Sequence, residues 1–154
     1  MAEYLGCIAS KQENVKIHAF RIDECPAEIR FINLHRGAFA GCDARGAGDM
    51  STLTGCRLEV MAELVTFPCT PLALRIAVAD IEMFELKSFA FLCTGGTHRS
   101  PALTCLLAMI HYNDARLGFH TTRVLEDADM MLDVSDGVGR APAGGIETFL
   151  ADES

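Results

Sequence analysis

The chain lacks the features of membrane, secreted and zinc-binding proteins. Charged residues break its apolar runs well short of bilayer-spanning length, so no transmembrane helix is expected. The N-terminal stretch carries Glu3 and no basic segment before an apolar one, and it does not resemble a signal peptide. Seven scattered cysteines include no CxxC pair, which favours reduced thiols in a cytoplasmic protein and disfavours zinc. We expect no metal and no cofactor.

Positive charge is also scarce. The sequence has 13 Lys and Arg residues against 21 Asp and Glu, which gives a formal net charge of −8 at pH 7. This charge repels nucleic acid at long range, although it leaves room for a local basic pocket. Half of the 154 residues are hydrophobic, and a chain of this length can bury a core, so we predict a single globular domain.

The hydrophobic pattern predicts strands and helices in alternation, with a Gly- and Asp-rich loop over 41–55. Strands are predicted at 15–22, 27–34, 89–93 and 118–125, and helices at 56–67, 70–86 and 100–113. A short helix is the alternative for 27–34. Thr70 is expected to cap the second helix, with Pro71 as the first helical residue. This order is typical of an α/β domain, here with one mixed sheet and helices packed on it.

The α/β domain is predicted to cover residues 1–133. Residues 134–154 are rich in Gly and Ala, and we expect them to form a loose tail, or one that docks only through Ile146 and Phe149.

The clearest chemistry lies in CTGGTHRS, residues 93–100, between a buried strand and a helix. A glycine-rich turn at a helix N-terminus gathers main-chain N–H groups and the positive end of the helix dipole, which favour an anion. The Arg99 guanidinium suits phosphate, His98 can donate to it, and Ser100 can both cap the helix and touch the anion. An ordinary turn without a ligand is the less favoured alternative. The expected ligand groups are Thr94, Gly95, Gly96, Thr97, His98, Arg99 and Ser100.

The spacing of Cys93 and Arg99, followed by Ser-Pro, resembles the Cys-x5-Arg-Ser-Pro loop of low-molecular-weight protein tyrosine phosphatases. That resemblance implies a Cys93 thiolate as nucleophile and loop amides with Arg99 on the phosphoryl group. The family places this loop near the start of the chain, however, and its late Asp-Pro motif, which bears the acid, is absent here. An aspartate such as Asp127 or Asp129 would have to replace that acid.

A longer match resembles the C-terminal domain of the RNase adapter protein RapZ and its YvcJ-like relatives. The loop CTGGTHRS resembles that family's GCTGG-x-HRS, and the order and spacing of weaker matches hold from about residue 15 to residue 127. Three stretches of this chain carry the weaker matches. CDARG at 42–46 resembles the family's Asp-x-Arg element, and LTG at 53–55 resembles its Leu-Thr-Gly. HTTRVLED at 120–127, which contains Arg123, resembles a later segment of the family.

In that family the domain binds a small RNA and senses an amino-sugar phosphate. The resemblance implies a pocket in which Asp43 contacts a hydroxyl or amine, Arg45 supplies a second cation, and the loop holds phosphate together with Arg123. An ion pair of Arg45 with Asp43 or Asp49 across a turn is an equal alternative. In this interpretation Cys93 is a packed thiol and not a nucleophile.

The chain departs from the family in ways that affect RNA more than a small ligand. The kinase-like domain that precedes this domain in RapZ is not matched, and the family's lysine after Leu-Glu is Asp127. We therefore expect a non-catalytic domain that binds a phosphorylated sugar, a nucleotide or an RNA phosphate in a regulatory or sequestering role. A cysteine-dependent phosphatase is the second hypothesis, and an RNA-binding adapter, disfavoured by the acidic charge, is the third. We expect no membrane partner, and the exposed sheet edge and apolar helix positions allow a homo-oligomer.

Overall fold

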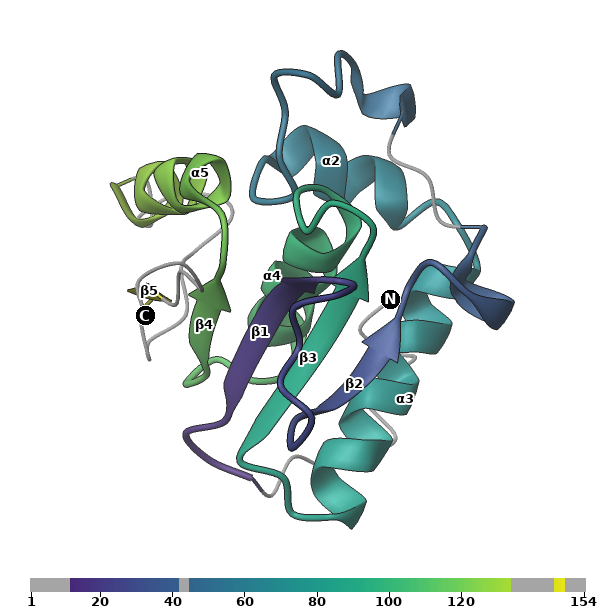
Figure 1. The fold of residues 1–154 in the computed structure, drawn as a ribbon, viewed down its shortest axis with the longest axis vertical. Helices are drawn as coiled ribbons and strands as arrows, with labels where there is room; N and C mark the ends of the chain where they lie inside the picture. The colour runs from purple at the N-terminus through teal and green to yellow at the C-terminus, as the bar shows by residue number, and fades with distance from the viewer. Residues whose placement is uncertain (1–11, 42–44, 134–145, 149–154) are drawn as a thin grey trace.

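The structure is a computed structural model that describes residues 12–41, 45–133 and 146–148 (Figure 1). It is an α/β domain, as predicted, built on a five-stranded sheet in the order β2-β3-β1-β4-β5. The strands are β1 (Lys16–Arg21), β2 (Arg30–Asn33), β3 (Ser88–Cys93), β4 (Arg116–Phe119) and β5 (Ile146–Thr148). Every pairing between these strands is parallel, so the expectation of a mixed sheet is wrong.

Four α-helices and two short 3-10 turns connect the described strands. They are η1 (Gly37–Phe39), η2 (Arg45–Ala47), α2 (Leu58–Leu64), α3 (Cys69–Met83), α4 (Arg99–Ile110) and α5 (Thr122–Asp133). In the tail predicted to be loose, β5 places Ile146 in the sheet beside β4, while Phe149 lies outside the described residues.

The strand predicted at 118–125 is wrong in its second half, because β4 ends at Phe119 and α5 begins at Thr122. The β-branched residues of this segment favour a strand locally. The buried positions Val124 and Ala128 are instead four residues apart, which is the spacing of one helix face, and both belong to the core. Packing over the longer span therefore overrides the local preference.

The start of α3 also differs from the prediction. Pro68, and not Thr70, is the residue that precedes the first helical turn. Thr70 is fully buried, and its hydroxyl donates to the carbonyl of Leu64 at 2.6 Å, which ties the end of α2 to the start of α3. The residue thus joins two helices rather than capping one.

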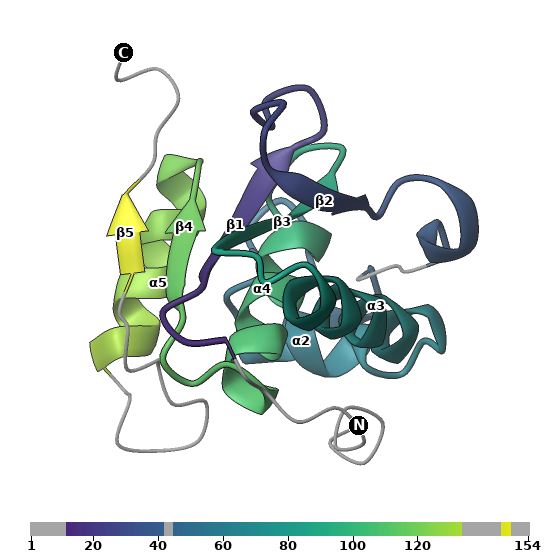
Figure 2. The same ribbon diagram turned by 90° about the horizontal axis from the view of Figure 1, so that it is seen from below.

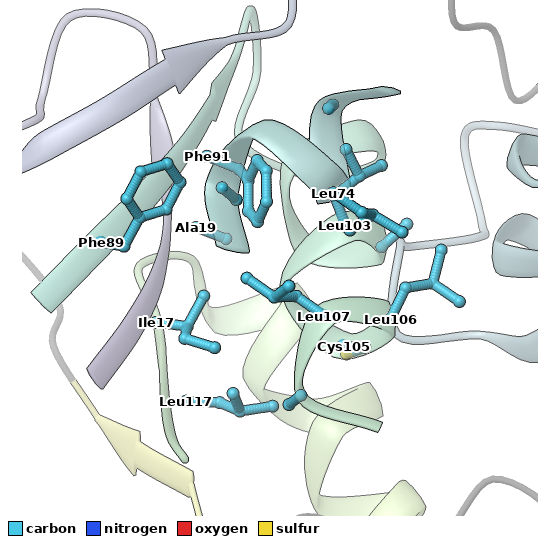
Figure 3. Packing of buried hydrophobic residues seen from close by; sticks show 14 of the residues in the cluster. Ile17, Ala19, Leu74, Phe89, Phe91, Leu103, Cys105, Leu106, Leu107 and Leu117 are labelled. Carbon is cyan, nitrogen blue, oxygen red and sulfur yellow. The ribbon is translucent and has the colours of Figure 1, made fainter. Parts of the chain in front are cut away.

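The main core lies between one face of the sheet and the helices α2, α3 and α4, and it includes Val124 and Ala128 of α5. Alternate residues of β1 and β3, such as Ile17 and Phe91, point toward Leu74 of α3 and Leu103 of α4 (Figure 3). Each fully buried side chain of this size contributes about 1.5–3 kcal/mol. All residues from 100 to 108 are buried, because α4 crosses beneath β1 on its way from β3 to β4. This explains why α4 is apolar on every side.

A smaller cluster covers the opposite face of the sheet. Phe20, Ala90 and Leu92 pack there against Cys25 and Ile29 of the β1–β2 connection. Figure 2 shows this connection on one side of β1 and β3 and the helices α3 and α4 on the other. The parallel strands are thus covered on both faces, as their continuous apolar sequence predicts.

No single helix in the described part of the chain is long and apolar enough to cross a membrane. The helices α2 and α3, bent by 95° at their junction, meet the length and composition criteria only when taken together.

His111, the residue that directly follows α4, gives the fold a pH dependence. The His111 Nε2 atom is buried without a hydrogen-bond partner among the described residues, and burial lowers the pKa of this imidazole. The unfolded chain therefore takes up a proton near pH 6.5 that the folded chain resists, so stability should fall as the pH drops through this value. Replacing His111 by Gln should reduce the decrease in unfolding free energy between about pH 8 and about pH 5, the range in which an ordinary histidine titrates. Urea unfolding at several pH values measures this dependence. An unchanged pH slope would contradict the assignment.

Candidate functional site

The candidate site lies at the edge of the sheet where the parallel strands end. Residues 94–98, here called the cradle loop, connect Cys93 at the end of β3 to Arg99 at the start of α4 (Figure 1). The loop lies against the end of β1, because the amide of Ile22 donates to the carbonyl of Cys93 at 2.9 Å. Ligands of parallel α/β sheets bind outside these carboxyl ends.

The cradle loop holds a run of main-chain donors. Among the described residues, the N–H groups of residues 94–98 donate no hydrogen bond. Thr94 and Gly95 are exposed, and the loop leads directly into the N-terminus of the 12-residue helix α4. These donors and the positive end of the helix dipole are therefore free to interact with an acceptor from outside, as an anion site requires.

The two glycines of the loop serve different needs. Gly96 has a φ of +68°, and a Cβ there would lie 2.9 Å from the amide nitrogen of Arg21. A side chain at Gly95 would meet only Thr97 Oγ1, at 3.7 Å. Gly96 is thus required by the backbone conformation and by the contact with β1, whereas Gly95 keeps the exposed side of the loop open.

This difference gives a matched pair of variants. Gly96→Ala should lower the free energy of unfolding by about 2–3 kcal/mol, because it combines a left-handed conformation with contact against the backbone of β1. Gly95→Ala should change the same quantity by less than about 0.5 kcal/mol. Urea unfolding of both variants measures the contrast, and equal losses would show that the loop does not lie on β1 as described.

Arg99 lies across the ends of β2 and β3. Its Nη1 donates to the carbonyl of Leu34 at 3.1 Å, and its Nη2 to Thr94 Oγ1 at 3.4 Å. The β2–β3 ladder has its last bond from the Leu34 amide to the Leu92 carbonyl, at 2.8 Å. If the ladder continued, the Leu34 carbonyl would accept the next hydrogen bond from the Thr94 amide. It accepts the hydrogen bond from Arg99 Nη1 instead. The guanidinium therefore helps to keep the first amide of the loop out of the sheet.

His35 belongs to the same group, although it was not among the predicted ligand residues. Its Nδ1 lies 3.0 Å from Thr94 Oγ1, so His35, Thr94 and Arg99 form a chain of polar contacts at the exposed end of β3. No short motif marks this histidine. Its only sequence signal is its position two residues after the end of β2.

His98 and Arg123, both predicted ligand groups, donate instead to main-chain carbonyls of the segment that contains Met50 and Leu53. The His98 Nε2 donates to the carbonyl of Met50 at 2.9 Å. An Nη2 of Arg123 donates to the same carbonyl at 3.1 Å and to that of Leu53 at 2.8 Å. Since a ring nitrogen that donates to a carbonyl must carry the proton, the Nε2 of His98 is committed to this segment. His98 and Arg123 therefore position the segment before Gly55, and the predicted donation of His98 to the anion is not made through Nε2.

The segment LTG at 53–55 is packed onto the cradle loop. The Gly55 amide donates to the carbonyl of Thr97 at 2.8 Å. The Thr54 hydroxyl donates to Asp127 Oδ2 at 2.6 Å, and Arg57 lies 3.9 Å from the other oxygen of this carboxylate. The cradle loop, this segment and α5 thus form one connected unit. Asp127, one of the two candidates for a phosphatase acid, is committed to its contacts within that unit.

Cys93 and Ser100 lie beneath the loop. Cys93 is only 2% exposed, and its Sγ is 3.2 Å from Ser100 Oγ and 3.4 Å from the Ser100 amide. The buried hydroxyl of Ser100 also donates to the Phe20 carbonyl, at 3.4 Å. Contrary to the prediction, Ser100 therefore faces the interior and does not present its hydroxyl to a ligand. The sulfur lies in the core between β3 and the first turn of α4.

The remaining predicted groups are not brought to the cradle loop by any described contact. Arg45 is exposed on η2, which packs against α2, and Asp43 lies outside the described residues. A shallow depression of about 420 Å³ lies elsewhere, at the free edge of β2. Its lining residues are Ala27, Glu28, Ile29, Arg30, Phe31 and Asp80. The described residues contain no group of three or more side chains that could hold a metal ion.

Comparisons of the chain with protein-family models, with curated proteins and with solved structures found no match. The resemblances to the RapZ C-terminal domain and to low-molecular-weight phosphatases therefore stay predictions.

Proposed function

We propose that the cradle loop binds the phosphate group of a phosphorylated sugar or nucleotide, and that the protein holds this ligand in a regulatory or sequestering role without turning it over. One observation carries the proposal. Arg99 is half-buried beside a run of free amides, and it has no carboxylate partner among the described residues.

Arg99 differs from three other arginines of the chain in the oxygens that surround it. Arg21, Arg30 and Arg57 each lie within 3.5 Å of a carboxylate oxygen. Among the described residues, Arg99 instead has only neutral oxygens as hydrogen-bond partners, although the chain carries a net charge of −8. Withdrawing a charge from water is unfavourable unless an opposite charge compensates for it. A phosphate seated on the loop amides would supply that opposite charge and would accept the planar donors of the guanidinium.

The position of Cys93 supports binding without turnover. Attack on phosphorus needs a sulfur that reaches the ligand, whereas Cys93 is 2% exposed and is covered by Ser100. An acid for the leaving group is also needed, and Asp127 is bonded to Thr54 and lies near Arg57. These contacts favour a packed thiol over a nucleophile.

The experiment measures thermal stabilisation by inorganic phosphate, a phosphosugar and a nucleotide, alongside hydrolysis of p-nitrophenyl phosphate. Ligand at 100 times its Kd should stabilise the fold by about 2.7 kcal/mol, in the wild type and in Cys93→Ser alike. Neither protein should release nitrophenol. Hydrolysis that is lost in Cys93→Ser would establish the phosphatase instead. A salt-sensitive shift of RNA that is lost in Arg99→Ala and in Arg123→Ala, without any effect of small phosphates, would establish the RNA adapter.

Cysteine labelling gives a second readout. Iodoacetamide should modify Cys93 in the folded protein at least about tenfold more slowly than the partly exposed Cys69, because alkylation needs an accessible thiolate. Mass spectrometry of digested samples resolves the two sites, and labelling in urea, where both should react at similar rates, is the control. Labelling of Cys93 as fast as Cys69 in the native protein would favour the nucleophile.

A further inference from the structure

The exposed face of α3 is apolar. Leu72, Ile76 and Met83 are 39%, 36% and 73% exposed, and the half-buried Ala79 lies in line with them. These residues recur at intervals of four, three and four positions, which places them in one stripe along the helix. Solvent-facing helix surfaces normally carry charged residues, but Arg75 is the only exposed charged residue of α3.

The stripe is self-complementary when one copy of the helix is reversed. Two antiparallel copies centred between Ala77 and Val78 place Leu72 of each against Met83 of the other, and Ile76 against Ala79. Large residues then meet small ones at the centre, which permits close interdigitation. A two-fold interface requires this reciprocity: if Leu72 of one copy contacts Met83 of the other, then Met83 of the first copy contacts Leu72 of the second.

We propose that a second copy of this chain covers the stripe, so that the protein forms a two-fold dimer through antiparallel α3 helices. This inference rests on α3 and is independent of the cradle loop. The border of the stripe is compatible with burial, because Asp80 is already paired with Arg30 at 3.0 Å and that guanidinium lies 4.2 Å from the centre of the Phe84 ring. The contact thus buries no unpaired carboxylate at this border.

The size of the stripe sets the expected affinity. A helix of 15 residues is about 22 Å long and about 10 Å wide, so the contact is smaller than the roughly 800 Å² per partner of standard interfaces. We therefore expect a dissociation constant on the order of micromolar or weaker. Each chain carries a net charge of −8, and screening of this repulsion should tighten the dimer as salt increases.

Sedimentation equilibrium across protein concentrations of about 1 µM to 1 mM tests the dimer. Ile76→Glu should weaken association at least about tenfold, since it places a charge at the centre of the contact. Val65→Glu is the matched control, because Val65 is 38% exposed on the adjoining α2 end and lies outside the stripe. Phosphate binding should be unchanged in both variants. A wild type that stays monomeric at high salt, or equal weakening by both variants, would overturn the proposal.

Disulfide trapping tests the antiparallel orientation. Leu72→Cys and Met83→Cys are made separately in a background with Cys7, Cys25, Cys42 and Cys69 replaced by Ser, and the two proteins are mixed under mild oxidation. The 72–83 heterodisulfide should predominate, because the two copies of residue 72 lie about 16 Å apart along the helix axis in this arrangement. Predominant 72–72 linkage would overturn it. So would co-flotation of the protein with phosphatidylcholine vesicles that is lost in Ile76→Glu without any dimer in solution, since a lipid surface would then cover the stripe.

Discussion

Replacing Gly55 by Ala should lower the free energy of unfolding by roughly 3–5 kcal/mol. A Cβ at this position would lie 2.1 Å from the carbonyl oxygen of His98 and 2.4 Å from the amide nitrogen of Ala102. Both atoms belong to the backbone at the start of α4, so no side-chain rotation can relieve the overlap. The segment containing Gly55 would have to separate from the cradle loop.

The loss should extend to the hydrogen bond between the Gly55 amide and the Thr97 carbonyl, which is 2.8 Å long. Urea unfolding measures the change, with Gly41→Ala as the control because a Cβ at Gly41 has no atom within 4 Å. The control should change stability by less than about 1 kcal/mol. A Gly55→Ala protein as stable as the control would show that LTG does not pack against the loop.

The same contact links stability to the proposed function. The backbone of Gly55 lies close to the His98 carbonyl, and the His98 ring in turn donates to the Met50 carbonyl. Any Gly55→Ala protein that still folds should therefore bind phosphate more weakly than Gly41→Ala, because the cradle loop is no longer held in its binding conformation.

The sequence was sufficient to predict β3 and α4, where local signals agree. The apolar run FAFLC is a buried strand, and Ser-Pro falls in the first turn of the helix that begins at Arg99. The start of α5 was mispredicted because Thr121, Thr122 and Val124 favour a strand in isolation. Its helical form depends on contacts with distant elements, such as the bond from Thr54 to Asp127, which no local window contains.

The candidate site likewise has a part that is contiguous in sequence and a part that depends on contacts between distant segments. The cradle loop is contiguous in sequence and carries its own glycines and arginine, so it could be found without a structure. The contact of His35 with Thr94, by contrast, depends on the order and register of the strands. Asn33 pairs with Leu92 across β2 and β3, so that His35 falls opposite Thr94 two residues later. The meeting of His98 and Arg123 at the Met50 carbonyl joins three separate segments and has no counterpart in any local pattern.

Replacing Arg99 by Ala should weaken phosphate binding by roughly 10- to 100-fold, because a charge-assisted hydrogen bond contributes about 1.5–3 kcal/mol. Arg99→Lys should fall between the wild type and Arg99→Ala, since it keeps the charge and loses the planar fork. Arg75→Ala is the control, with the same change in charge at an exposed site on α3. Calorimetric titration of inorganic phosphate gives the affinities directly. If Arg99→Ala bound phosphate with a dissociation constant within about twofold of the wild type, the guanidinium would not contribute to the site.

The stability of Arg99 variants should also depend on the ligand. Without an anion, the wild type carries a half-buried cation whose partners within the described part of the chain are the Leu34 carbonyl and the Thr94 hydroxyl. Arg99→Met keeps most of the side-chain volume and removes this charge, so its unfolding free energy should lie close to that of the wild type in phosphate-free buffer. Saturating phosphate should stabilise the wild type and leave Arg99→Met nearly unchanged, so that the difference appears only with the ligand. A constant difference at all phosphate concentrations would mean that Arg99 serves the fold alone.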